Sequence, residues 1–157
     1  MELNQKLPDF TLETDEAKTT SLSSYAGKPV VLFFYPRADT PGCTIEACGF
    51  RDTFKKLQAA GAVVLGISRD TPKAQAKFRA KYDLPYTLLA DVDEKVCNLF
   101  GVLKEKNMYG KKVWGIERTT FLIGPDQTLL HIFPKVTPEG HAEEVLALIK
   151  EWNKAHK

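Results

Sequence analysis

The sequence predicts an α/β fold in which a mixed central sheet is covered by helices on both faces. Short apolar runs, typical of buried strands, alternate along the chain with longer stretches of helical periodicity. Near the C-terminus, two apolar runs separated by a turn sequence indicate an antiparallel hairpin. The alternating part implies parallel crossover connections, and the hairpin adds antiparallel edge strands, so the sheet is expected to be mixed.

The individual elements follow from local signals. Residues 28–36, KPVVLFFYP, form a continuous apolar run bounded by prolines, as expected of a strand buried on both faces. Residues 41–60 carry apolar side chains at helical spacing, and Gly61 ends this helix. Thr71 is the expected N-cap of the next helix because Pro72 follows it. The other predicted elements are a strand at 62–68, a helix at 71–82, a strand at 86–91, a short helix at 93–101, hairpin strands at 118–123 and 128–133, and a helix at 137–157.

The chain reads as a single domain spanning residues 1–157, since no linker or repeat divides it. The order of elements fits a thioredoxin-like layout, with a reactive segment between a central strand and a helix. Three lysine-rich stretches, FKK, KAQAKFRAKY and KEKNMYGKK, are predicted to be solvated helix faces and loops. They lack interleaved aromatic residues and the formal charge is only +2, so nucleic-acid binding is not expected.

The chain also lacks the sequence signals of export. The N-terminus, MELNQKLPDF, has no apolar core of signal-peptide length, and the longest apolar run, VVLFFY, is too short to cross a bilayer. The odd count of 3 cysteines argues against a secreted disulfide scaffold. We therefore expect a cytoplasmic protein that does not bind membranes.

The segment YPRADTPGCTIEACGFRD contains the strongest chemical signal. With Thr40 as N-cap and Pro41 at the first helical position, Cys43 falls in the first turn of the helix. Unpaired backbone N–H groups and the helix dipole stabilise an anion there, and the thiolate is the reactive form of cysteine. Pro36 stiffens the loop and Gly42 permits close approach to the backbone. Cys43 is therefore the predicted nucleophile, rather than a small buried hydrophobe.

A second cysteine, Cys48, follows five residues later, which is an unusual spacing on a helix. Five residues correspond to about 140° of rotation and ~7.5 Å of rise, which separates the two Cα atoms by roughly 8.7 Å. A disulfide requires less than ~7 Å. Cys43 and Cys48 can therefore bond only if the first turns of the helix unwind. This suggests a two-state element, although Cys48 as a tolerated thiol on the helix flank remains open.

The other candidate residues have simpler interpretations. Cys97 lies among apolar neighbours and is expected to be a buried structural thiol. His131, His141 and His156 are not at ligand spacing and are interpreted as solvated, so neither a metal nor another cofactor is predicted. Trp114 either lines a substrate pocket or packs beneath a loop. The apolar face of the last helix, with Val145, Leu148, Ile149 and Trp152, is predicted to be core.

These residues resemble a known family. The pattern Pro-x-x-x-Thr-x-x-Cys, present as Pro36, Thr40 and Cys43, is similar to the active-site signature of peroxiredoxins. The stretches TPGCTIEACGFRD, VVLGISRD and RTTFLIGPDQTLLHIF resemble the Q-type branch, also called bacterioferritin comigratory proteins. The resemblance extends over almost the whole chain, and Cys48 is the feature that most narrows the branch.

The resemblance implies a role for each site residue. Cys43 would attack the O–O bond of a peroxide and become a sulfenic acid. Thr40 would hydrogen-bond within the pocket, Pro36 would shield the nucleophile from water, and Arg118 would hold the thiolate and the peroxide oxygens. Cys48 would resolve the sulfenic acid as an intramolecular disulfide. Gly42 and Gly49 are poor helix formers, which would ease the unwinding.

The resemblance further implies hydrogen peroxide and organic hydroperoxides as substrates, thioredoxin or a similar thiol as reductant, and a monomer. Two alternatives stay open from the residues alone. A protein disulfide oxidoreductase would use the same fold, but the chain has no Cys-x-x-Cys pair. A non-catalytic redox switch could use the same two cysteines. Catalytic turnover of peroxide would distinguish an enzyme from such a switch.

Overall fold

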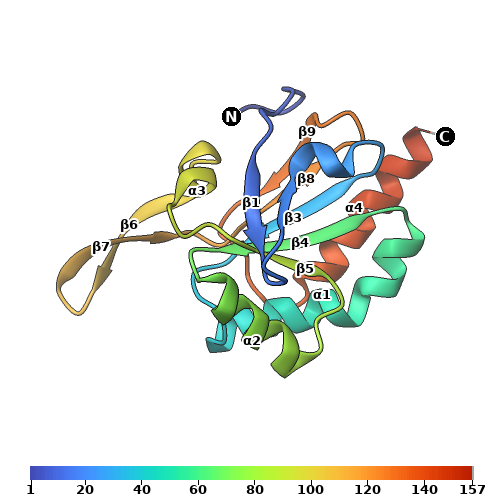
Figure 1. The fold of residues 1–157 in the computed structure, drawn as a ribbon. Coiled ribbons are helices and arrows are strands. Elements are labelled where there is room, and N and C mark those ends of the chain that lie inside the picture. The colour runs from blue at the N-terminus through green and yellow to red at the C-terminus, as the bar shows by residue number, and fades with distance from the viewer. Residues whose placement is uncertain (157) are drawn as a thin grey trace.

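The computed structural model describes residues 1–156. Its central sheet has seven strands in the order β2-β1-β5-β4-β3-β8-β9 (Figure 1). The strands are β1 (Thr11–Thr14), β2 (Thr19–Ser21), β3 (Val30–Phe34), β4 (Val63–Ser68), β5 (Thr87–Ala90), β8 (Thr119–Ile123) and β9 (Leu129–Phe133). The helices are α1 (Pro41–Ala59), α2 (Pro72–Tyr82), α3 (Lys95–Leu99) and α4 (His141–Ala155), with a 3₁₀ turn η1 (Leu22–Tyr25).

The strand directions confirm a mixed sheet. β3, β4 and β5 are mutually parallel neighbours, whereas β8 pairs antiparallel with β3, and β9 antiparallel with β8. The predicted hairpin of β8 and β9 is therefore present. Of its two strands only β9 lies at an edge of the sheet, because β8 lies between β3 and β9. At the opposite edge, β1 and β2 add an antiparallel pair that the sequence did not suggest, since these strands are short and polar.

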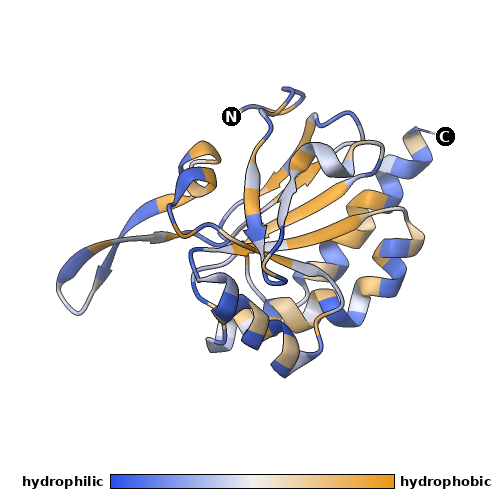
Figure 2. Cartoon of the chain, in the orientation of Figure 1, coloured by the Kyte–Doolittle hydropathy of each residue, from blue (hydrophilic) through white to orange (hydrophobic). Residues whose placement is uncertain are grey.

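The alternation of side chains along β3 builds two core layers. Val31, Phe33 and Tyr35 point into a layer formed with α1, α2 and α4. The intervening residues Val30, Leu32 and Phe34 point into a second layer, closed by α3, η1 and the N-terminal segment. Figure 2 shows this apolar character concentrated in the central strands, with hydrophilic residues on the outer helix faces. Helices on both faces of the sheet are thus confirmed.

For one lysine-rich stretch the predicted exposure is confirmed but the predicted secondary structure is wrong. KEKNMYGKK was expected to be a solvated helix face or loop, but it belongs to a separate two-stranded sheet of β6 (Leu103–Met108) and β7 (Lys111–Ile116). This hairpin projects from the body of the molecule (Figure 1). Tyr109 and Gly110 both have positive φ, 53° and 79°, as a tight two-residue hairpin turn requires. The turn chemistry and the strand register, rather than the lysine content, decide the local structure.

The last helix differs from its prediction in two respects, the residue at which it begins and the burial of that residue. It was expected from residue 137, but α4 begins at His141 because Gly140 adopts a left-handed φ of 77° at the N-cap. His141, predicted to be solvated, is only 3% exposed. Val145 and Ile149 are buried as predicted, while Leu148 and Trp152 are half-buried at the margin of the core. Within the described residues, no helix is both long and apolar enough to cross a membrane.

Candidate active site

The start of α1 has the predicted local structure. Thr40 is the N-cap with extended backbone angles, φ −96° and ψ 157°, and Pro41 opens the helix. The Thr40 hydroxyl does not cap the helix, because it donates instead to the carbonyl of Arg37 at 2.8 Å. The free N–H groups of the first turn therefore remain available to an anion. Pro36 lies half-buried directly after Tyr35, where the chain leaves the sheet.

Cys43 is buried beneath the guanidinium of Arg118. Its side chain is 1% exposed, and Nη2 of Arg118 donates to Sγ at 3.4 Å. Arg118 immediately precedes β8, whose first residue Thr119 pairs with Phe34 at the end of β3. The antiparallel β3–β8 register thus brings the arginine to the loop that carries the cysteine. A Cβ on Gly42 would lie 3.0 Å from Nη2, so a side chain there would displace the guanidinium by a few tenths of an ångström.

Glu46 is a site residue that the sequence reasoning missed. Its Oε1 accepts a hydrogen bond from Nη1 of Arg118 at 2.8 Å, and its side chain has 0% exposure. Burial raises the pKa of Glu46 to about 7, although the arginine opposes the shift. The signal was available, because residues three apart on a helix share one face, and Glu46 is three residues after Cys43. Arg118 therefore bridges two groups on the same face of α1.

The loop before α1 is anchored to neighbouring elements. The backbone N–H of Ala38 donates to Oδ2 of Asp70 at 2.8 Å, and the hydroxyl of Ser68 donates to the same oxygen at 2.6 Å. Ser68 is the last residue of β4, which runs parallel to β3. These contacts hold residues 36–40 against the carboxyl ends of two adjacent strands and so define where Cys43 lies.

Cys48 lies half-buried in the same uninterrupted helix as Cys43. All three cysteines are free thiols. For Cys43 and Cys48 this agrees with their five-residue spacing on an intact helix. Burial is the main reason that the pKa of Cys48 is raised, and the nearby Arg51 partly opposes this effect. A thiol of this kind is less reactive than a thiolate until its surroundings change.

Comparisons with known proteins agree with this geometry. The model of the AhpC/TSA family matches residues 3–132. A Coxiella burnetii protein provisionally named peroxiredoxin bcp is 54% identical over 93% of this chain and 97% of its own length. The peroxiredoxin Bcp of Bacillus subtilis is 42% identical over 96% of both chains. A crystal structure of a cysteine mutant of Xylella fastidiosa PrxQ has a TM-score of 0.93 and 37% identity, covering 98% of each chain.

The chain belongs to the AhpC/TSA family, as a Q-type peroxiredoxin. The family expectation drawn from the sequence is thereby confirmed, and so is the thioredoxin-like fold. Peroxiredoxins are thiol peroxidases, which reduce a peroxide at the expense of a thiol reductant. The enzyme hypothesis is therefore confirmed over a disulfide oxidoreductase or a non-catalytic switch.

The other residues considered in the sequence have different surroundings. Cys97 is buried as predicted. Its burial is the main cause that raises the pKa of its thiol well above the usual range, and the neighbouring carboxylate of Asp91 adds to the shift. Trp114 is 64% exposed on β7, so it neither lines a pocket nor packs beneath a loop. His141 contributes to packing, with Nε2 lying 2.8 Å from the hydroxyl of Thr120. No cluster of three His, Cys, Asp or Glu suited to a metal occurs among residues 1–156.

Proposed function

We propose that Cys43 is the peroxidatic cysteine of this peroxiredoxin. The observation that carries the proposal is the hydrogen bond from Arg118 to Sγ in a buried site at the start of a helix. The Cys43 thiolate attacks one peroxide oxygen, and the O–O bond breaks. The departing alkoxide or hydroxide takes a proton and leaves as alcohol or water, while Cys43 becomes a sulfenic acid. Hydrogen peroxide and organic hydroperoxides both undergo this reaction.

The surrounding residues then divide the remaining tasks. Arg118 holds the thiolate and the oxygen that gains charge as the O–O bond breaks. The first-turn N–H groups supply further hydrogen bonds near Cys43 at the helix start. Because the Thr40 hydroxyl donates its proton to the carbonyl of Arg37, its oxygen acts as an acceptor for the peroxide O–H. Pro36 covers the nucleophile at the point where the loop leaves β3. Glu46 fixes the guanidinium plane through its 2.8 Å contact, so that Nη2 faces the sulfur.

Cys48 is the proposed resolving cysteine. Its thiol condenses with the sulfenic acid of Cys43, forming a disulfide and releasing one water. Because ideal helix geometry separates the two Cα atoms by roughly 8.7 Å, the first turns of α1 must unwind for this step. An external dithiol then reduces the disulfide by exchange and becomes a disulfide itself.

The finer assignments follow from this cycle. Thioredoxin is the proposed reductant, since a helix-borne disulfide is open to a protein dithiol once the helix has unwound. A monomer suffices, because both cysteines come from one helix and no second subunit is needed to form the bond. A cytoplasmic location fits a dithiol that must be returned to its reduced state after each turnover. The seven-stranded central sheet, with a core layer on each face, supports a single domain over residues 1–157.

The test is peptide mapping by mass spectrometry after one equivalent of hydrogen peroxide, without reduction, on the wild type and on Cys48→Ser. We expect a Cys43–Cys48 disulfide in the wild type and a Cys43 sulfenic acid in the variant. A Cys43–Cys97 bridge, or an unmodified Cys43, would contradict the assignment. Catalytic consumption of peroxide with thioredoxin, compared with glutaredoxin, tests the reductant.

A further inference from the structure

The segment that must unwind is held at both flanks by one residue of another helix. Tyr82 is the last residue of α2. Its hydroxyl donates to Oδ1 of Asp39 at 2.7 Å, just before α1 begins. Its backbone carbonyl accepts from Nη1 of Arg51 at 2.9 Å, one turn after Cys48. Asp39 and Arg51 thus lie on either side of Cys43 and Cys48 in the chain. Both are hydrogen-bonded to the same residue, Asp39 to its hydroxyl and Arg51 to its backbone carbonyl.

The upstream contact is reinforced by charge. Nζ of Lys81 lies 2.8 Å from Oδ2 of Asp39, so the carboxylate binds one neighbour with each oxygen. Asp39 has a left-handed φ of 60°, a conformation that aspartate tolerates better than most residues. Hydrogen bonds from Lys81 and then Tyr82 lower the pKa of Asp39, in keeping with a carboxylate held in its charged form.

The helix that provides these contacts, α2, is itself held in place by buried residues and hydrogen bonds. Phe78 is buried in the core, and the side chain of Gln75 bonds both the Tyr35 hydroxyl and the carbonyl of Leu89. Arg79 pairs with the carboxylate of Asp15. These polar contacts of α2 do not involve α1, so we expect α2 to keep its place when the first turns of α1 unwind.

We propose that Tyr82 is a positioning residue that holds both flanks of the Cys43–Cys48 segment and so favours the folded start of α1 over its unwound form. The inference rests on the proposed roles of the two cysteines. A segment whose ends are fixed gains less conformational entropy on unwinding than one with free ends. The contacts of Tyr82 thereby set how often the sulfenic acid meets Cys48.

This equilibrium has a chemical consequence, because the sulfenic acid has two fates. It condenses with Cys48 to a disulfide and water, or it reacts with a second peroxide, which transfers one oxygen to give the sulfinic acid and leaves as alcohol or water. The first fate needs the unwound form and the second needs only the peroxide. Weakening the hold of Tyr82 should move the product from sulfinic acid toward disulfide.

The test compares Tyr82→Phe with a matched control, Tyr25→Phe. Tyr82→Phe removes the bond to Asp39 but keeps both the ring, which packs on Phe78, and the carbonyl that Arg51 uses. Tyr25 is also half-buried and also loses one hydroxyl contact, to Thr20, but it packs in the opposite core layer. The readout is the peroxide concentration at which half of Cys43 becomes sulfinic acid, measured by mass spectrometry with reductant present.

We expect Tyr82→Phe to raise this concentration about fivefold, the effect of losing one hydrogen bond, and Tyr25→Phe to leave it unchanged. Amide hydrogen exchange of residues 40–50 in the reduced protein should also become faster in Tyr82→Phe only. The proposal would be overturned if the peroxide concentration that converts half of Cys43 to sulfinic acid were equal in the two variants, or lower in Tyr82→Phe than in the wild type. Lys81→Met, which weakens the hold on Asp39 at an exposed position, replaces Tyr82→Phe if the latter does not fold, with the same criterion.

The outcome also separates this inference from the proposed function. If the wild type forms no Cys43–Cys48 bridge, the assignment of the resolving cysteine fails, and the role of Tyr82 fails with it. If the bridge forms but Tyr82→Phe behaves as Tyr25→Phe does, only the role of Tyr82 is refuted. Arg51 is unsuitable for this comparison because its charge also acts on the pKa of Cys48.

Discussion

At the scale of single residues, Arg118 serves two partners with one guanidinium. Nη1 binds the buried carboxylate of Glu46 and Nη2 binds Sγ of Cys43. A planar fork with donors at fixed angles can do this, whereas a lysine presents one point charge. The carboxylate is costly to bury, and Oε2 of Glu46 has no hydrogen-bond partner within residues 1–156. The site therefore accepts a penalty in stability in order to orient the arginine.

This penalty predicts a pH dependence of stability. Folding raises the pKa of Glu46 from its ordinary value of 4.5 to about 7. Between these values the folded protein binds more protons than the unfolded chain, so the free energy of unfolding falls as the pH rises through this window. We expect Glu46→Gln to lose this part of the decline, which is about 3 kcal/mol at most at 1.36 kcal/mol per pKa unit.

Urea denaturation between pH 4.5 and pH 7.5 measures the effect, with Glu143→Gln as the control on an exposed glutamate of α4. The difference in the free energy of unfolding between Glu46→Gln and the wild type should change with pH. The difference between Glu143→Gln and the wild type should stay constant. A Glu46→Gln curve that also runs parallel to the wild type would show that this carboxyl does not titrate in the window.

At the scale of elements, α1 has to be both formed and able to unwind. Thr40 and Pro41 start it, and the buried face of Cys43, Ala47 and Phe50 secures it to the sheet. Gly49 weakens it within the segment between the two anchored flanks, because glycine lowers helix stability by about 1 kcal/mol relative to alanine. A Cβ at Gly49 would find only Ala142 at 3.8 Å, an ordinary contact, so no packing constraint demands glycine there.

Gly49→Ala should therefore make the helix start harder to unwind. We expect disulfide formation after sulfenic acid formation to slow about fivefold, the equivalent of about 1 kcal/mol, with a corresponding rise in sulfinic acid. Stopped-flow tryptophan fluorescence with mass spectrometry of quenched samples gives both quantities. The rate of the first oxidation of Cys43, measured in a Cys48→Ser background, is the control and should stay unchanged. A disulfide that forms as fast as in the wild type would show that Gly49 does not limit unwinding.

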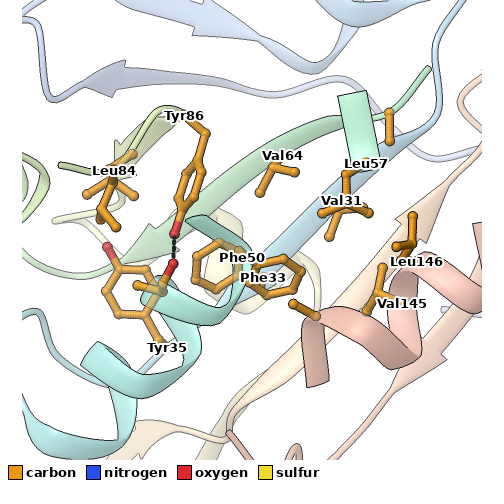
Figure 3. Packing of buried hydrophobic residues seen from close by; sticks show 14 of the residues in the cluster. Val31, Phe33, Tyr35, Phe50, Leu57, Val64, Leu84, Tyr86, Val145 and Leu146 are labelled. Carbon is orange, nitrogen blue, oxygen red and sulfur yellow. Dashed lines mark hydrogen bonds between the residues drawn. The ribbon is translucent and has the colours of Figure 1, made fainter. Parts of the chain in front are cut away.

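At the scale of the whole molecule, the core beneath the site is packed around β4. Phe33, Phe50 and Tyr86 lie together between the sheet and α1, and the Tyr86 hydroxyl donates to the carbonyl of Ala47 at 2.6 Å (Figure 3). Gly66 of β4 faces this cluster, and a Cβ there would come within 2.8 Å of Leu88 and 2.9 Å of Phe33. The absence of a side chain at Gly66 is what allows the aromatic residues to approach the sheet.

Gly66→Ala should destabilise the protein by about 1–3 kcal/mol through overpacking, a fall of roughly 3–10 °C in Tm for a domain of this size. Gly49→Ala is the matched control, since it adds the same methyl group where there is room and should raise Tm. Differential scanning calorimetry of both variants measures the contrast. Equal melting temperatures for the two would mean that the core around Gly66 adapts freely to a methyl group.

Much of this architecture follows from local signals in the sequence. The start of α1 at Thr40 and Pro41, the cap of α2 at Thr71, and the burial of β3 on both faces depend on residues close to each other in the sequence. Such features were predictable because capping, proline geometry and side-chain periodicity act over short distances. The peroxiredoxin signature at Pro36, Thr40 and Cys43 is local in the same sense.

What only the tertiary structure decided is the meeting of distant groups. Arg118 reaches Cys43 and Glu46 across 75 and 72 residues because β8 pairs antiparallel with β3. The burial of His141, the hold of Tyr82 on both flanks of the cysteine segment, and the pairing of β1 with β5 depend equally on long-range packing. The sequence by itself determined which thiol could become a nucleophile, and the family resemblance added Arg118. The packing of the sheet decided how Arg118 meets Cys43 and that Glu46 joins them, because electrostatic contacts depend on distance in space and not along the chain.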